Sequence, residues 1–162
     1  MEIIKAEKDR LDEMMEIYTY ARKFMKEHGN PNQWGADYPL RSHIEEDIEK
    51  GQSYLCLENG KIACVFVYFT GEDPSYAHIE GGEWLNDREY GVVHRIASAE
   101  GTRGAATFCL NWCFKQCRNL RIDTHELNFP MQNLLKKLGF VRCGTIYVRD
   151  HSPRSAFQKC DE

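Results

Sequence analysis

The feature that most constrains the fold is a pair of apolar segments, residues 53–57 and 61–69, joined by Glu58, Asn59 and Gly60. An Asn-Gly pair between two apolar segments is a strong signal of a β-hairpin, because both residues tolerate the positive φ of a tight turn. Antiparallel strands are therefore expected in the middle of the chain. This expectation argues against a doubly wound, purely parallel sheet.

The flanking sequence divides into strand-like and helix-like segments. A strand is expected at residues 3–6, and Asp9 is expected to cap a helix in which apolar residues recur at helical spacing as far as Met25. Ser42 and Glu45 form the expected capping box of a second helix. Further strands are expected at residues 91–98, 120–125, 141–148 and 155–159, and further helices at residues 105–118 and 128–138.

This order predicts a single α/β (α+β) domain over residues 1–162, with a mixed central sheet of about seven strands flanked by about four helices. A turn-rich stretch at residues 71–90 separates the hairpin from the fourth strand. The strand-to-helix junction at residues 101–106 would then lie at a carboxyl end of the sheet, where α/β folds bind ligands.

Composition excludes several classes of function. The net charge of −4 lacks the basic excess of a nucleic-acid-binding domain, and no apolar run is long enough for a transmembrane helix. Residues 1–8 mix charged with apolar side chains, unlike a signal peptide. Seven cysteines, an odd number, then favour reduced thiols and a cytoplasmic protein. We expect no nucleic-acid or membrane partner, and a homodimer stays open.

The junction at residues 101–106 has the composition of a phosphate-binding turn. A helix start offers unpaired N–H groups and about half a positive charge, and a glycine there allows a phosphate to approach the backbone. Arg103 adds a cation. The alternative is an ordinary glycine turn that enters a helix, since neither the Walker A nor the dinucleotide-binding spacing is present.

Four segments together carry a family resemblance. They are residues 93–98 (Val-His-Arg-Ile-Ala-Ser), 101–106, 122–128 (Ile-Asp-Thr-His-Glu-Leu-Asn) and 134–140 (Leu-Leu-Lys-Lys-Leu-Gly-Phe). Their order and spacing resemble the GNAT N-acyltransferase superfamily over nearly the whole chain. The last helix, which ends in Leu-Gly-Phe, and the strand-end Asn128 before it are the most specific part.

The resemblance implies a mostly antiparallel sheet in which the fourth and fifth strands splay apart to receive acetyl-CoA. It implies that the backbone of residues 101–106 binds the pyrophosphate, that the backbone of residues 96–98 pairs with the pantetheine arm, and that Asn128 contacts the pantetheine end. The implied cofactor-binding residues are Ile96, Ala97, Ser98, Gly101, Thr102, Arg103, Gly104, Ala105, Ala106, Asn128 and Met131.

The implied activity is an N-acetyltransferase that moves an acetyl group from acetyl-CoA to a primary amine, on a small molecule or a peptide, by direct attack in a ternary complex. Two positions depart from the family pattern. Gly101 replaces a family Arg or Gln in the phosphate loop, and Leu135 replaces a tyrosine that often protonates the leaving thiolate. These departures keep an alternative open, in which the chain is a catalytically weak CoA-binding regulatory domain.

Transfer to an amine requires a base, because an alkyl ammonium with a pKa near ~10.4 must first lose a proton. His94 is the first candidate because Val92, His94 and Ile96 would share one strand face, and a hydrogen-bonded structural histidine is the alternative. Glu126 is the second candidate and Glu100 the third, with a solvated carboxylate as the alternative. The thiolate acid would be Tyr147, Cys143 or water. A backbone N–H of Ile96 or Ala97 would polarise the carbonyl.

Aromatic residues could form the wall of an acceptor site. Trp34, Tyr38 and Trp84 could hold an amine by cation–π attraction, or they could pack on the sheet. Cys109, Cys113 and Cys117 follow one helical stripe, which favours core packing over metal binding. Asp123 and His125 share a strand face without the further ligands that a metal needs, so no metal is expected.

Overall fold

The computed structural model describes residues 1–161. Within that range it contains seven strands, four α-helices and two short 3-10 helices, in the predicted order. Their bounds are β1 Glu2–Lys5, η1 Lys8–Arg10, α1 Leu11–Glu27, α2 Arg41–Glu49, β2 Ser53–Glu58, β3 Lys61–Thr70, η2 Pro74–Tyr76, β4 Gly91–Ser98, α3 Ala105–Cys117, β5 Asn119–Thr124, α4 Phe129–Lys137, β6 Val141–Tyr147 and β7 Pro153–Cys160.

The strands form one mixed sheet in the order β1-β2-β3-β4-β5-β7-β6. β2 and β3 are antiparallel and are joined by the predicted turn, in which Asn59 and Gly60 have φ values of 54° and 78°. β4 and β5 are parallel and pair at the first two positions of β4, Gly91 and Val92. Two strands that splay apart must still pair at one end, and β4 and β5 pair where both strands begin. The predicted fold class is confirmed.

The chain divides into two compact units, and the boundaries between them fall within β3, β4 and α3. The first unit comprises Met1–Tyr68 with His94–Trp112, and the second comprises Phe69–Val93 with the chain from Cys113 onward. All seven strands belong to one sheet. The division into two units does not decide whether residues 1–162 form one domain, so the single domain stays a prediction. No helix within residues 1–161 is long and apolar enough to span a bilayer.

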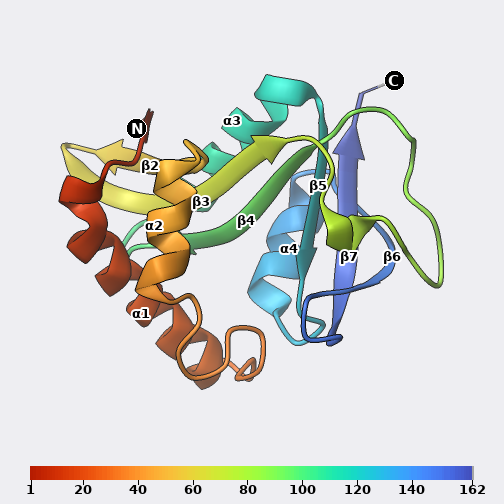
Figure 1. Ribbon diagram of the computed structural model, residues 1–162, viewed down its shortest axis with the longest axis horizontal. Coiled ribbons are helices and arrows are strands. Elements are labelled where there is room, and N and C mark those ends of the chain that lie inside the picture. The colour runs from red at the N-terminus through yellow and green to blue at the C-terminus, as the bar shows by residue number, and fades with distance from the viewer. Residues whose placement is uncertain (162) are drawn as a thin grey trace. The chain divides into compact units, whose positions relative to one another are not determined.

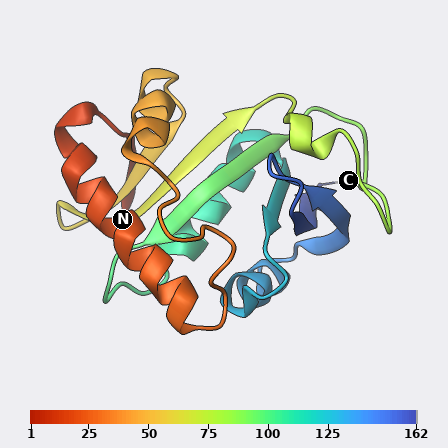
Figure 2. The same ribbon diagram turned by 60° about the horizontal axis from the view of Figure 1, so that its bottom comes forward.

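In the first unit, α1 and α2 lie on one face of the strands and the start of α3 lies on the other (Figures 1 and 2). Met14, Tyr18 and Ile44 from the two helices pack with Leu55 and Val65 of the sheet, and all five are fully buried. Residues three or four apart share one face of α1, and alternate residues share one face of β2 and β3. Each element therefore has a continuous apolar face, and these faces pack together.

On the opposite face, α3 packs through an aromatic ring and a row of thiols. The ring of Trp112 lies 5.1 Å from that of Tyr54 and 6.0 Å from that of Phe66. Cys109 and Cys113 are fully buried, so the predicted core packing of this stripe is confirmed for them. A hydrogen bond with Cys64, together with burial, raises the pKa of the Cys109 thiol and keeps it protonated.

In the second unit, the segment at residues 71–90 packs against β5, β6 and β7. Tyr76, Trp84 and Tyr90 form a cluster, and the Arg121 guanidinium lies 4.3 Å from the Trp84 ring centre and 3.9 Å from that of Tyr90. The backbone of Glu80 pairs with Thr145 of β6. This segment therefore covers β6, which is an edge strand of the sheet.

Two predicted helix starts are wrong. Asp9 lies inside the 3-10 helix Lys8–Arg10, and α1 begins at Leu11 without a side-chain cap. α2 begins one residue before Ser42, so Ser42 cannot cap it; instead the Leu40 N–H donates to Nδ1 of His43 at 2.9 Å. A 3-10 turn leads into α1, and a hydrogen bond to a histidine ring holds the start of α2. A capping motif in the sequence does not distinguish these arrangements from a side-chain cap.

Candidate active site

The turn between β4 and α3 is tight and glycine-dependent. Gly101 and Gly104 have φ values of 79° and 73°, a region that side chains rarely adopt. The Thr102 hydroxyl donates to the Ala99 carbonyl at 2.8 Å and closes the turn. The Gly104 carbonyl accepts the first helical hydrogen bond, from the Phe108 N–H at 3.0 Å. The sequence therefore places a helix start directly after a rigid, small-residue turn.

This turn has room for an anion. A Cβ added at Gly101 or Gly104 would meet no atom within 4 Å, so open space adjoins the backbone at both positions. Arg103, between them, is exposed. The N–H groups of a helix's first turn have no partner within the helix and carry a partial positive charge. The residues present therefore fit a phosphate-bearing ligand.

The strand that leads into this turn contains a residue in an unusual conformation. Arg95 of β4 has a φ of 48°, although strand residues have negative φ. Gly91, Val92 and Val93 are all buried, so the strand does not alternate regularly. The predicted shared face of Val92, His94 and Ile96 rested on regular alternation, and that alternation is interrupted at Arg95. His94 itself is half-buried.

Arg95 is held by a network of polar side chains that the sequence analysis missed. Its Nε donates to Oδ2 of Asp47 at 2.8 Å, and its Nη2 donates to Oδ1 at 2.6 Å. Its Nη1 donates to the Tyr38 hydroxyl at 2.6 Å, and its own carbonyl accepts from the Tyr18 hydroxyl at 3.0 Å. These contacts tie β4 to α1, to α2 and to the loop between the two helices.

Burial and charge pairing act in opposite directions on this network. Burial lowers the pKa of Arg95, but hydrogen bonds and attraction to Asp47 outweigh it, so the pKa lies above its ordinary value and the guanidinium stays charged. Burial raises the pKa of Tyr18, so its hydroxyl stays a donor. One signal could have revealed the network: Asp47 lies on the apolar stripe of α2, between Ile44 and Ile48.

The predicted acceptor wall has a clear packing role in the first unit. Trp34 is buried, with its ring 5.8 Å from Tyr18 and 6.3 Å from Tyr38. Tyr38 is half-buried and uses its hydroxyl to accept from Arg95, while its carbonyl accepts from Arg22 at 3.2 Å. The packing alternative therefore describes Trp34, and contact between these rings and an acceptor stays a prediction.

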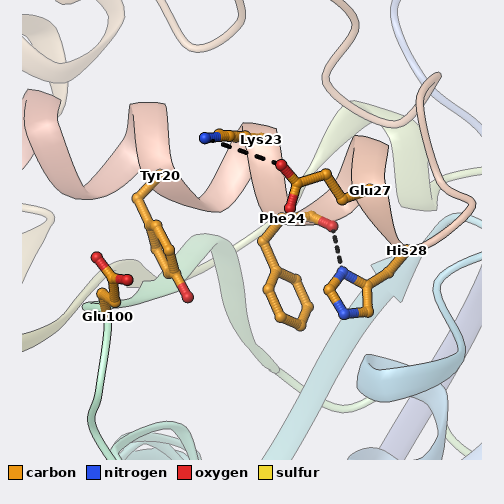
Figure 3. Close-up of a pocket in the computed structure, with 6 residues that line it drawn as sticks. All are labelled: Tyr20, Lys23, Phe24, Glu27, His28 and Glu100. Carbon is orange, nitrogen blue, oxygen red and sulfur yellow. Dashed lines mark hydrogen bonds and ion pairs between the residues drawn. The ribbon is translucent and has the colours of Figure 1, made fainter.

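Glu100, the third candidate base, lines a surface pocket of about 330 Å³ (Figure 3). The rest of the pocket comes from α1 and the residue after it, including Tyr20 and the stacked rings of Phe24 and His28, whose centres lie 3.8 Å apart. Ile96 and Ser98, which precede Glu100 along the chain, are half-buried, whereas Ala97 is buried in the core.

The remaining candidate side chains lie in the second unit, and several of them have structural partners. Tyr147 is exposed and donates to Oε1 of Glu80 at 3.0 Å, which raises the pKa of its phenol. Trp84 donates its indole N–H to the Tyr76 carbonyl at 2.9 Å. Glu126 is exposed, and its carbonyl accepts from Gln132. Catalytic or substrate roles for these residues stay predictions.

Asn128 is the N-cap of α4. Its Oδ1 accepts from the Met131 N–H at 3.2 Å, which holds the start of the helix. Leu135, at the position where the family often has a tyrosine, is fully buried. Asp123 accepts from Tyr76 at 2.7 Å. Among residues 1–161 no cluster of three or more His, Cys, Asp or Glu could hold a metal.

No protein-family model and no curated protein matches the chain. Among solved structures, a GNAT-family acetyltransferase from Streptococcus agalactiae 2603 is 32% identical with a TM-score of 0.91, over 99% of this chain and 95% of the other. A Staphylococcus aureus Mu50 structure assigned as an acetyltransferase is 27% identical with a TM-score of 0.71, over 99% of both chains.

A third structure supports the fold alone. The NatC complex bound to Gag peptide and CoA is similar at 12% identity, with a TM-score of 0.65 over 100% of both chains.

Proposed function

Because the chain belongs to the GNAT family of acetyltransferases, we propose that it moves an acetyl group from acetyl-CoA to a primary amine in a ternary complex. The acceptor would be a small molecule or a peptide. The observation that carries the proposal is the turn of Gly101–Gly104, which ends β4 and opens α3 with free space beside its backbone. The NatC structure, which this chain resembles in fold alone, contains CoA, and we propose the same class of donor by analogy.

Residues 101–106 would hold the pyrophosphate of acetyl-CoA through backbone N–H groups at the helix start, with Arg103 as an added cation. Gly101 in place of a family Arg or Gln removes one side-chain contact, so the backbone would do most of the binding. Residues 96–98 would pair with the pantetheine arm as an added strand does, through main-chain hydrogen bonds.

Acetyl-CoA supplies a thioester carbonyl that an uncharged amine can attack, so that a C–N bond forms, the C–S bond breaks and free thiol leaves. His94 would take the amine proton, with Glu126 as the second candidate base. The Ile96 N–H would stabilise charge on the carbonyl oxygen. Tyr147 would return a proton to the thiolate. Its raised pKa keeps the phenol protonated at neutral pH, although its proton is shared with Glu80.

Asn128 and Met131 complete the proposed contacts to the pantetheine end. The alternative of a catalytically weak CoA-binding domain rests on Leu135, which is fully buried and has no proton to give. The two proposals differ in one measurable quantity. An acetyltransferase releases CoA thiol when an amine is present, whereas a binding domain is stabilised by acetyl-CoA and releases none.

The experiment compares the wild type with Gly104→Asp and a matched control, Gly60→Asp. Both glycines are exposed, have φ values of 73° and 78°, and have no atom within 4 Å of an added Cβ. Gly104→Asp puts a carboxylate where the pyrophosphate would bind, whereas Gly60→Asp changes only the hairpin turn. Acetyl-CoA at 100 times its Kd adds about 2.7 kcal/mol to the stability of a protein that binds it.

We expect acetyl-CoA to raise the melting temperature of the wild type and of Gly60→Asp, and to leave Gly104→Asp unchanged. With a panel of primary amines, the wild type and Gly60→Asp should release thiol, and Gly104→Asp should release none. Equal stabilisation of all three proteins would remove the turn from the binding site. A wild type that acetyl-CoA does not stabilise would refute the proposed function.

A further inference from the structure

The conformation of Arg95 requires an explanation beyond folding. A non-glycine residue with φ of 48° costs free energy, and such residues persist only where the surrounding structure fixes them. Glycine would adopt the same φ without this cost. The chain keeps an arginine instead, and four hydrogen bonds with Tyr18, Tyr38 and Asp47 hold its two ends.

The contacts fix both ends of the residue. The guanidinium forms a two-pronged ion pair with Asp47, in which the Arg95 and Asp47 side chains are 19% and 7% exposed. Two parallel hydrogen bonds define the plane as well as the position of a guanidinium. At the backbone end, the Tyr18 hydroxyl holds the Arg95 carbonyl at 3.0 Å. Helices α1 and α2 therefore set the orientation of one peptide group in β4.

That peptide group also carries the Ile96 N–H. In a planar trans peptide the C=O and the N–H point in opposite directions. Because the Arg95 carbonyl is directed at Tyr18 in α1, the Ile96 N–H is directed away from α1. A hydroxyl buried under the strand thus determines where a backbone donor on the strand points.

Stability alone does not account for this arrangement. A buried ion pair is weak evidence for stability, because apolar side chains of similar size often do as well. An apolar pair would not define the orientation of a single peptide group. A pre-aligned donor is what stabilises developing charge on a carbonyl oxygen, since it needs no reorganisation during the reaction.

We propose that Tyr18 and the Asp47–Arg95 ion pair are positioning residues that aim the Ile96 N–H at the thioester carbonyl. This inference rests on the proposed function and assigns it three side chains that touch no substrate. Since Tyr38 also binds the guanidinium, the loop between α1 and α2 is linked to the same donor.

The test uses Tyr18→Phe, which removes the hydroxyl and keeps the ring that packs on Trp34. Arg95→Lys is the second variant, because lysine keeps the charge and loses the two-pronged geometry. The control is Ile44→Val, a change in the same buried cluster that removes one methylene and touches none of the polar groups. For each protein, kcat, the KM for acetyl-CoA and the melting temperature are measured.

We expect Tyr18→Phe and Arg95→Lys to lower kcat by about 10- to 100-fold, less than the ~10²–10³-fold loss seen when such a donor is removed outright. The KM for acetyl-CoA should change less than about threefold, because pyrophosphate binding lies elsewhere. Ile44→Val should lower the melting temperature and keep the wild-type kcat. A Tyr18→Phe protein with wild-type kcat, or an Ile44→Val protein with an equal loss of kcat, would overturn the proposal.

A second readout separates this proposal from the proposed function. The amide NMR signal of Ile96 should shift when acetyl-CoA is added to the wild type, and should shift much less in Tyr18→Phe. If the wild type binds acetyl-CoA and releases no thiol with any amine, the transferase fails while this comparison still decides the positioning role. An equal Ile96 shift in both proteins overturns the positioning role alone.

Discussion

Gly82 is the position where a single methyl group should break the pairing between the segment at residues 71–90 and β6. A Cβ added there would overlap the carbonyl oxygen of Cys143 and lie 3.0 Å from its carbonyl carbon. Both atoms are backbone, so no side-chain rotation can relieve the clash. Gly82→Ala should therefore push the segment at residues 71–90 away from β6.

The magnitude follows from the contacts that join the segment to β6. The Glu80 N–H donates to the Thr145 carbonyl at 2.9 Å, and the Thr145 N–H donates to the Glu80 carbonyl at 2.8 Å. Each such bond contributes about 1 kcal/mol, so their loss costs about 2 kcal/mol. For a chain of this size, about 2 kcal/mol lowers the melting temperature by roughly 4–8 °C.

The assay combines thermal unfolding with hydrogen exchange at the Thr145 amide. Gly82→Ala should lower the melting temperature by the stated amount and speed Thr145 exchange by at least tenfold. Gly81→Ala is the control, because a Cβ there meets no atom within 4 Å and changes only a residue at φ of 70°. It should cost about 1 kcal/mol and leave Thr145 protected. A protected Thr145 amide in Gly82→Ala would refute the reasoning.

Two further predictions concern α4 and its start. Leu135→Tyr should lower the melting temperature by several degrees without raising kcat, because position 135 is fully buried and extra atoms in a packed core cost about 1–3 kcal/mol; a higher kcat in a thiol-release assay would contradict this. His125 accepts from the Leu127 N–H through Nδ1, and burial first, then Arg154, lowers its pKa below the ordinary 6.5. The unfolded chain therefore binds this proton more readily, and stability should fall as pH drops from 7 to 5. Urea unfolding of His125→Gln should show a smaller loss over that range, and an equal loss would exclude His125 as its source.

Patterns with a local physical cause could be predicted from the sequence. Asn59 and Gly60 specify a hairpin because few residues accept two successive positive φ values, and the structure has that turn. The helix start after Gly104 follows in the same way, from a glycine turn followed by small residues. Residues 91–98 form the predicted strand with the same bounds. In each case the cause lies within a few residues of the effect.

Long-range polar contacts could not be predicted in this way. Arg95 is one charged residue in a strand, and Asp47 lies 48 positions away along the chain. Their pairing depends on how α2 packs against the sheet, which no local spacing records. The assumption of regular alternation in β4 failed at the same residue, because tertiary contacts fix a φ that strand propensity disfavours. The prediction that His94 is the base used that alternation, so a kinetic measurement on a His94 variant must now test it.

The same contrast indicates where this chain could differ from its relatives. The proposed phosphate-binding turn would act through its backbone conformation, which glycine and a helix start provide with few side chains. The proposed aiming of the Ile96 N–H depends on one side chain each from α1, α2 and β4, which are Tyr18, Asp47 and Arg95. Tyr18 is the most deeply buried of the three. Donor binding should therefore depend mainly on the two glycines of the turn, with a smaller contribution from the Arg103 charge, whereas turnover should be sensitive to a single hydroxyl. A chain that retained the turn and lost Tyr18 or Asp47 would bind acetyl-CoA well and transfer its acetyl group slowly.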